Sequence, residues 1–401
     1  MTLIDLKEFF EYTPGVLRLL VEPSHLSNIA KPLPSRRCKS VVAEVVRVDA
    51  KSLQLRHQPS GELTTLSFDY LILACGSLYP ATNGRNVIKS GVEQPTLEAR
   101  AAVWQAAASD LDAAESVLVV GGGPVGVELA AEIACVHPHK RVTLVSRSER
   151  LCADLPEAVG DHCLAWLRSR GVEVLSGVGT TGALSEDGAT LSDGRTLSGY
   201  DAVYNCAGGS ANTRMLQPTF SSHLDPKGRL IVNDHMQVAG HPRVFGIGDM
   251  MIHERSGDLK LGHTAELNAH VAVENVCRLA DAADAADKIA DAETPTAAAD
   301  LVSYPEFTSL GLARSPRVFC VSLGKHSAVM AFNGLVLAGW MPALLKWGLE
   351  WTKVAACAER PIGTLFWEVA DLMTALITRV GILPVPPPPT RRPAAKSAKV
   401  E

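Results

Sequence analysis

The pattern of apolar and polar residues along the middle of the chain predicts alternating strands and helices. Apolar runs at Val117–Val120 and Arg141–Val145 are short and bounded by polar or turn residues, as in buried parallel strands. Apolar residues at helical spacing follow the first run, at Val127, Ala130, Ala131 and Ala134. Strand and helix patterns continue to alternate as far as Cys206. This alternation favours an α/β fold with parallel sheets, and we expect one domain over residues 115–215.

Three glycines stand at the turn between the first of these strands and its helix. Gly121 permits a tight turn, Gly123 lets the backbone approach a pyrophosphate, and Gly126 lets the helix pack closely on the strand. The N-terminus of the helix offers N–H groups to phosphates. A glycine-rich structural turn is the alternative. The strand context favours dinucleotide binding in a Rossmann-like domain.

The next strand ends in Ser146-Arg147, where an acidic residue would favour a ribose 2′-hydroxyl and repel a 2′-phosphate. We therefore expect Ser146 and Arg147 to accept NADPH as well as NADH. The alternative is that Arg147 is a solvated surface charge.

Strand patterns on both sides of this region predict a second, discontinuous Rossmann-like domain. The segment Thr2–Asp5 reads as a strand that ends in an acid, followed by a helical patch at Val16–Val21. We assign residues 1–114 and 216–300 to this domain, within which 280–300 reads as a surface extension or linker. Its other predicted elements are strands at Val41–Asp49, Ser52–His57, Thr64–Phe68, Tyr70–Ala74, Leu230–Val232 and Arg243–Asp249, and helices at Ala99–Leu111 and Thr264–Leu279.

The C-terminal region, residues 301–383, is predicted as a hairpin followed by amphipathic helices. Asn333-Gly334 between two apolar runs is a hairpin signal and excludes a membrane span there. The tryptophan-bearing stretch 340–380 is predicted either to pack in a core or to lie at a membrane interface. Residues 384–401 are rich in proline and then in lysine and arginine, which predicts a disordered tail.

The composition limits the classes of function. The chain has 401 residues, 47% of them hydrophobic and 20% charged, which suits a globular protein of two or three domains. Its net charge of −5 and its lack of a basic stripe with aromatic residues argue against nucleic-acid binding. Nine cysteines at no metal-binding spacing fit a reducing compartment. We expect a cytoplasmic protein; attachment to a membrane surface and association with mitochondria stay open.

Taken together, Gly121–Glu132, Leu71–Ser77 and Val244–Asp249 resemble the motifs of the pyridine nucleotide-disulfide oxidoreductase superfamily, in the members with two dinucleotide-binding folds. Phe10–Gly15 and His137–Leu144 look like the branch of apoptosis-inducing-factor-like ferroptosis suppressor proteins, which is related to type II NADH dehydrogenases. The resemblance extends over residues 1–380. It implies a bound FAD that NAD(P)H reduces and that a quinone or similar acceptor reoxidises.

The resemblance also implies roles for individual residues. Asp5 would hold the adenosine ribose of FAD, Cys75 and Gly76 would line its path, and Asp249 would bond its ribityl chain. Glu128 matches an acid near the nicotinamide and the flavin, and is our candidate catalytic residue. A helix N-terminus would lie by the pyrimidine side of the flavin, formed by Thr264, Ala265, Glu266 and Leu267.

Each role has a simpler alternative. Asp5 could be a surface carboxylate at a strand end, Glu128 a partner of the helix dipole and Asp249 a turn residue. The histidines His263 and His270 are expected to be structural.

Two absences complete the prediction. The chain has no cysteine pair at the close spacing of a redox-active disulfide, so electrons should leave the flavin directly for a diffusible acceptor. The family's first βα unit, with its own glycine fingerprint, has no counterpart before Thr2. We expect an incomplete gene model, rather than a short isoform or a diverged protein that has abandoned FAD, and weak FAD binding by the chain as written.

These observations lead to a flavin-dependent NAD(P)H oxidoreductase with a quinone-like acceptor. A nucleotide-binding sensor or interaction protein without turnover is the alternative. A dehydrogenase with a single Rossmann domain is a third hypothesis, which leaves Val244–Asp249 without a role.

Overall fold

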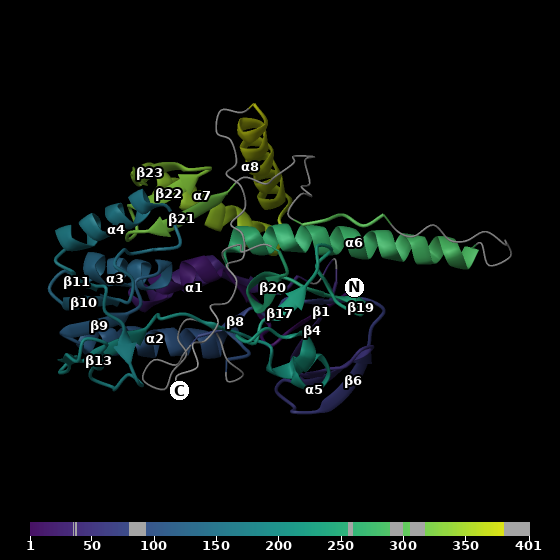
Figure 1. The fold of residues 1–401 in the computed structure, drawn as a ribbon, viewed down its shortest axis with the longest axis horizontal. Coiled ribbons are helices and arrows are strands. Elements are labelled where there is room, and N and C mark those ends of the chain that lie inside the picture. Colours follow the sequence, from purple (N-terminus) through teal and green to yellow (C-terminus); the bar gives the residue numbers. More distant parts are fainter. Residues whose placement is uncertain are drawn as a thin grey trace, which may run out of the picture.

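The computed structural model describes residues 1–34, 36, 38–79, 94–255, 260–288, 300–304 and 317–380. The α/β fold predicted from the sequence is confirmed. Figure 1 shows a parallel sheet with α3 and α4 on one side of the view, a largely β region around β4, β6 and β19 on the other, and α8 projecting away from both. The tail at 384–401 lies outside the described residues.

The predicted central domain is built on a four-stranded parallel sheet in the order β11-β10-β9-β15. All of β9 is buried, because helices cover both faces of such a sheet. The strands are β9 (Ser116–Val120), β10 (Arg141–Ser146), β11 (Glu173–Ser176) and β15 (Ala202–Asn205), and the helices are α2 (Leu97–Ala113), α3 (Pro124–Val136) and α4 (Glu157–Ser169). A small antiparallel sheet follows β11, formed by β12 (Thr180–Thr181), β13 (Ala189–Leu191) and β14 (Thr196–Leu197).

The other half combines parallel and antiparallel pairing. Strand β1 (Thr2–Asp5) pairs in parallel with β4 (Lys39–Val48), which continues into an antiparallel meander of β5 (Ser52–His57) and β6 (Leu63–Ser67). Strand β7 (Leu71–Leu73) pairs in parallel with β19 (His241–Gly246). The remaining elements are β17 (Leu230–Val232), β18 (Gln237–Val238), β20 (Met251–His253), the short helix α5 (Gln217–Phe220) and the bridging pair β8 (Ser77–Leu78) and β16 (Ser210–Ala211).

Helix α6 (Gly262–Lys288) is longer than the sequence suggested. Residues 280–288 continue the helix, so the predicted helix end at Leu279, with a surface extension or linker after it, is wrong as far as Lys288. Alanine is the strongest helix former, and the alanine-rich sequence extends the helix with few apolar contacts. Residues 289–299 lie outside the described residues.

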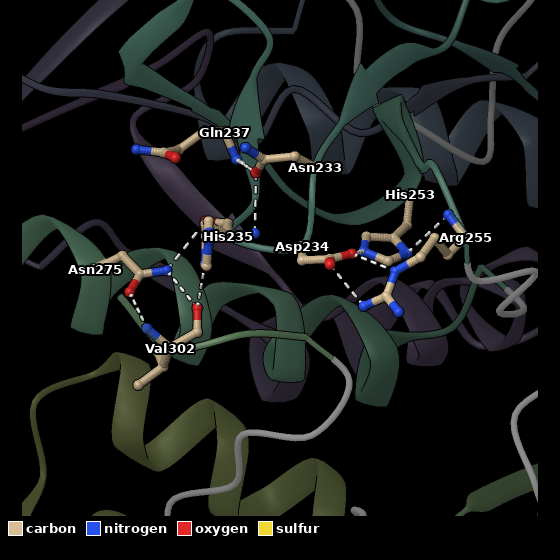
Figure 2. A network of polar contacts seen from close by, with 8 residues as sticks. All are labelled: Asn233, Asp234, His235, Gln237, His253, Arg255, Asn275 and Val302. Carbon is tan, nitrogen blue, oxygen red and sulfur yellow. Dashed lines mark hydrogen bonds and ion pairs between the residues drawn. The ribbon is translucent and has the colours of Figure 1, made fainter. Parts of the chain in front are cut away.

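A network of polar contacts holds segment 300–304 against α6 (Figure 2). Asn275 of α6 donates from Nδ2 to the carbonyl of Val302 over 3.0 Å and accepts from the Val302 N–H over 2.8 Å. The ring Nδ1 of His235 lies 2.9 Å from the same carbonyl. Nearby, Asp234 pairs with Arg255 at 2.6 Å and with His253 at 3.1 Å. These contacts fix residues 300–304 against the middle of α6.

The segment after β1 packs on the central domain. It forms the pair β2 (Phe9–Glu11) and β3 (Ala30–Pro32), the 3₁₀-helix η1 (Thr13–Leu20) and the short helix α1 (Leu26–Ile29). Its apolar residues share one hydrophobic core with β9, α2 and α3. The helical patch predicted at Val16–Val21 is therefore a 3₁₀-helix with a buried face.

The predicted C-terminal hairpin is confirmed. Strands β21 (Val318–Ser322), β22 (Ala328–Phe332) and β23 (Leu335–Gly339) form an antiparallel sheet. Asn333 and Gly334 both have positive φ, 48° and 95°, as a two-residue hairpin turn requires. Two helices follow, α7 (Trp340–Cys357) and α8 (Pro361–Arg379).

The sequence left open whether residues 340–380 pack in a core or lie at a membrane interface. The outer faces of both helices do not pack in a core. Every exposed side chain of α7 is apolar, and Trp340 keeps 71% of its surface exposed. On α8, large exposed apolar residues recur at helical spacing at Ile362, Leu365, Phe366, Val369, Leu372, Met373 and Leu376. Within the described part of the chain, no helix combines the length and the apolar character needed to cross a membrane.

Candidate functional site

The glycine fingerprint has the geometry of a nucleotide-binding turn. Gly121 has a φ of +124°, and a Cβ there would lie 2.5 Å from the carbonyl oxygen of Cys206. A Cβ at Gly126 would overlap the carbonyl oxygen of Gly121, so the helix can approach the strand only without one. A Cβ at Gly123 would have no neighbour within 4 Å. The backbone before α3 is thus open to a ligand, and these residues fit a dinucleotide pyrophosphate.

Ser146 and Arg147 differ in their surroundings at the end of β10. Ser146 is buried behind the fingerprint, where its Oγ donates to the carbonyl of Ser148 over 2.9 Å and its side chain fills the space beside Gly122. Arg147 is exposed. Contact with a ribose 2′-phosphate would therefore fall to the guanidinium of Arg147.

Asp249 lies in a turn that is fixed from two sides. Its Oδ2 accepts a hydrogen bond from Ser77 Oγ over 2.9 Å. The preceding Gly248 has a φ of +70° and donates from its backbone N–H to Asn268 of α6 over 3.4 Å. The carboxylate is thereby held between β8 and the start of α6.

Asp5 and Cys75 lie at the carboxyl ends of β1 and β7, which belong to different sheets. Burial raises the pKa of the Cys75 thiol to about 11, and the charge of Asp5 adds to the shift. The thiol is therefore protonated at neutral pH. The adjacent Gly76 turns the chain with a φ of +66°.

The first turns of α6 carry the remaining flavin candidates, Thr264, Ala265, Glu266 and Leu267. The Thr264 hydroxyl accepts a hydrogen bond from the Leu261 N–H over 3.1 Å and donates one to the Leu261 carbonyl over 2.9 Å, which fixes the start of the helix. Ala265 packs against the Gly248 turn, and Glu266 forms an ion pair with Lys353 of α7. The fold therefore gathers Asp249, Gly76 and this helix start around one region.

A cleft of about 350 Å³ lies on the other side of α7, between η1, α3 and the β21–β22 turn. Ionisable and apolar residues line it together. At its charged wall, Glu128 Oε1 lies 2.6 Å from Lys346 Nζ and accepts a hydrogen bond from the backbone N–H of Ser322 over 2.7 Å. Its apolar wall includes Trp340, Leu344 and Trp347.

Lys346 keeps its charge in this cleft. Burial works against the charged ammonium, but the Glu128 carboxylate, together with Cys320 and Glu132, raises the pKa of Lys346 above its ordinary value. Lys346 is therefore charged at neutral pH. Lys346 was not among the residues expected from the sequence.

Further ion pairs join the elements around the cleft. Arg18 of η1 lies 3.1 Å from Glu132 of α3, and His25 lies 3.1 Å from Glu350 of α7. Burial raises the pKa of Glu132 despite the opposing charge of Arg18. The spacing of Lys346, Glu350 and Lys353 could have revealed these pairs from the sequence. The three positions share one face of an otherwise apolar helix, which indicates charged partners on that side.

Two cysteines that are distant in sequence meet near the fingerprint. The thiol of Cys163 on α4 is hydrogen-bonded to Cys152, and both side chains are buried. The backbone N–H of Cys152 donates to the carbonyl of Gly122 over 2.8 Å. All nine cysteines are reduced, and Cys152 and Cys163 do not line the cleft.

The fold and the fingerprint define a two-nucleotide oxidoreductase, and comparison with known proteins identifies the family. The pyridine nucleotide-disulphide oxidoreductase family matches residues 13–275, and the chain belongs to it. Membership confirms the two cofactors expected from the sequence, FAD and a nicotinamide nucleotide.

Similar proteins support the same assignment. Ferroptosis suppressor protein 1 of Homo sapiens is 30% identical over 292 residues, which cover 68% of this chain and 73% of that protein. The structure of NDH2 from Plasmodium falciparum in complex with NADH has a TM-score of 0.62 at 13% identity, covering 96% of this chain and 94% of that one. The sulfide:quinone oxidoreductase of Aquifex aeolicus has a TM-score of 0.63 at 15% identity, covering 98% and 93%. The likeness to these two structures is one of fold.

Proposed function

We propose that this protein passes electrons from NAD(P)H, through FAD, to a quinone-type acceptor that binds in the cleft beside Glu128 and Lys346. The observation that carries the proposal is the composition of the cleft. The Glu128–Lys346 ion pair forms one wall, and Trp340, Leu344 and Trp347 form another. A quinone offers carbonyl oxygens to an ammonium group and an apolar ring to aromatic side chains, so both walls suit it.

The proposed cofactor sites use the residues described above. The nicotinamide nucleotide would contact Gly121, Gly123, Gly126 and Arg147, whereas the expected contact with Ser146 is replaced by a supporting role, because Ser146 is buried behind the fingerprint. FAD would contact Asp5, Cys75, Gly76, Asp249 and the start of α6 at Thr264, Ala265, Glu266 and Leu267. FAD when bound accepts a hydride equivalent and passes its two electrons on.

Glu128 is the candidate catalytic residue in this proposal. It lies on the fingerprint helix, and its link to Lys346 ties that helix to the acceptor cleft. Lys346 would orient a carbonyl oxygen of the acceptor and stabilise negative charge that develops on it. The sulfide:quinone oxidoreductase of Aquifex aeolicus, which has a similar fold, is named for a quinone, and this supports a quinone-type acceptor.

The proposed domains follow the two nucleotide sites. Residues 115–215 would bind NAD(P)H, and residues 1–114 with 216–300 would bind FAD. Separate hydrophobic cores around β9 and around β19 support this division, although residues 9–30 pack on the first of them. Residues 301–383 would form the acceptor side through the hairpin, α7 and α8.

The outer face of α7 and α8 is proposed to rest on a lipid surface. The ionisable side chains Lys346, Glu350 and Lys353 of α7 turn inward to partners, whereas its exposed positions are apolar. A helix that faces water has the opposite arrangement, with its charged side chains exposed and its apolar side chains buried. Trp340, Leu344 and Trp347 belong both to this face and to the cleft, so an acceptor dissolved in lipid could enter directly. We infer a peripheral protein on the cytoplasmic side of a membrane, with a mitochondrial membrane as one candidate.

An absorption spectrum tests the function. The purified protein, supplied with FAD, should show a flavin spectrum that NADH or NADPH bleaches without oxygen and that a short-chain quinone restores. A flavin that stays oxidised in the presence of both nucleotides would contradict the proposal. Binding of the nucleotides without bleaching would instead support the alternative of a sensor without turnover.

A further inference from the structure

His25 connects the protein surface with the cleft through its two ring nitrogens. Its Nε2 lies 3.1 Å from Oε1 of Glu350, which lines the cleft. Its Nδ1 lies 3.2 Å from the side-chain nitrogen of Asn28, which is exposed. The ring itself is buried. One imidazole thus spans the distance between solvent and the cleft.

The partners of His25 determine its tautomer. The amide nitrogen of Asn28 can only donate, so Nδ1 of the neutral ring accepts a hydrogen bond from it. The ring proton then resides on Nε2, which lies at ion-pair distance, 3.1 Å, from Glu350 Oε1 but is not aligned for a hydrogen bond to it. This arrangement suits transfer of a proton toward the cleft.

Other charged groups of the cleft form ion pairs with residues of opposite charge. Glu128 pairs with Lys346, and Glu132 pairs with Arg18. An arginine does not release its proton, and Lys346 is held in its charged form by Glu128. Glu350 differs because its partner is a histidine, a side chain that can accept a proton at one ring nitrogen and donate one from the other.

We propose that His25 and Glu350 form a relay that delivers a proton from solvent to the acceptor in the cleft. The inference rests on the proposed function. The net reaction is NAD(P)H + H⁺ + quinone → NAD(P)⁺ + quinol, which takes one proton from solvent while both electrons come from the nicotinamide. In this relay a proton from solvent adds to His25 Nδ1 as the Asn28 amide moves aside, the Nε2 proton passes to the Glu350 carboxylate, and the carboxyl group so formed gives that proton to a quinone oxygen. A turn of the ring then restores the neutral form with its proton on Nε2.

Several ionisable groups surround Glu350 and would tune the relay. Tyr12 is close enough that the Glu350 charge, together with burial, raises the pKa of its phenol, which therefore stays neutral. Lys346 and Lys353 share the inner face of α7 with Glu350, each with its own carboxylate partner. Cys320 of β21 has a pKa raised to about 11 by burial and stays protonated.

Assays with two different electron acceptors distinguish proton delivery from electron delivery. A short-chain quinone needs protons to become a quinol, whereas ferricyanide takes electrons alone. We expect Glu350→Gln and His25→Gln to lower kcat with the quinone by about 100-fold, the usual contribution of a positioned acid or base. Turnover with ferricyanide should stay within about twofold of wild type, and quinone turnover by the variants should show an increased solvent isotope effect.

The matched control is Glu22→Gln, which removes a carboxylate whose ion pair with Lys325 is exposed. This variant should resemble wild type with both acceptors. FAD content and thermal midpoint of each variant report whether the fold is intact. Equal losses with quinone and ferricyanide, or no loss with either, would overturn the relay. Wild-type protein that reduces ferricyanide but no quinone would refute the proposed function, and the relay with it.

Discussion

Glu128 Oε1 lies 2.6 Å from Lys346 Nζ, although the two residues are 218 positions apart in the sequence. Glu128 belongs to the helix that follows the glycine fingerprint, and Lys346 belongs to α7 near the other end of the chain. Two helical turns further along α7, Lys353 pairs with Glu266 at the start of α6. One helix therefore connects the proposed sites of both nucleotides and forms a wall of the cleft.

Replacing Lys346 should break the ion pair that links α7 to Glu128 on α3. In Lys346→Met the largely buried Glu128 carboxylate keeps the Ser322 N–H but loses its counter-charge, which should cost about 3 kcal/mol of folding free energy. Quinone turnover should also fall. Denaturant unfolding and steady-state kinetics measure both effects. The double variant Glu128→Gln/Lys346→Met should be more stable than Lys346→Met, because no unpaired charge remains.

Arg100 and Glu11 form a buried pair that joins α2 to the segment after β1. Arg100 is fully buried, its Nε lies 2.8 Å from Glu11 Oε1, and its guanidinium stacks on Trp104. Arg100→Met should lower the free energy of unfolding by about 3–5 kcal/mol, since it leaves a buried carboxylate unpaired. The control Arg56→Met breaks an exposed pair with Glu44 and should leave the denaturation midpoint in place. Similar losses in both variants would contradict this account.

Arg147 should govern the choice between nicotinamide nucleotides. If its exposed guanidinium contacts the 2′-phosphate, Arg147→Ala should raise the KM for NADPH about tenfold and leave that for NADH unchanged. The exposed Arg168 on α4 provides a control of the same charge. An equal change for both nucleotides would mean that Arg147 does not contact this phosphate.

The thiol of Cys75, just after β7, should resist alkylation at neutral pH. Burial, with a contribution from Asp5, raises the pKa of Cys75 from 9.0 to about 11, so the reactive thiolate forms only in alkaline solution. Its contribution to stability is complete below pH 9 and is lost as the pH rises through 11. Mass spectrometry after iodoacetamide treatment at pH 8 should find the exposed Cys277 modified before Cys75. Modification of Cys75 first would contradict the assignment.

The apolar face of α7 and α8 should bind lipid vesicles. Leu365 and Leu376 are 58% and 52% exposed, so Leu365→Glu/Leu376→Glu should leave the fold and the reduction of ferricyanide unchanged while abolishing flotation with liposomes. The control Leu63→Glu changes a leucine that is 55% exposed on β6 and should float like wild type. If the variant loses only self-association, as judged by sedimentation, the face joins two copies of the chain and not a membrane.

Much of the fold could be predicted from the sequence because its signals are local. Periodicity located β9, β10 and α2 within a few residues, and Asn333-Gly334 located the hairpin. The strand, glycine turn and helix from Ser116 to Val136 identify a nucleotide site because three glycines are needed within six residues for contacts of the backbone itself. Alanine-rich segments gave a weaker signal, and the end of α6 was misjudged for that reason.

The sequence by itself determined the class of fold, the two nucleotide regions and the candidate role of Glu128, since each depends on residues that are close together along the chain. Only the tertiary structure decided that Lys346 faces Glu128, that His25 faces Glu350, and that the tryptophans of α7 lie outside the core. These relationships join segments more than 200 residues apart or depend on which face of a helix meets its neighbours. An ion pair of this kind forms only where the fold brings two opposite charges together, and a local sequence pattern does not determine where a distant helix packs.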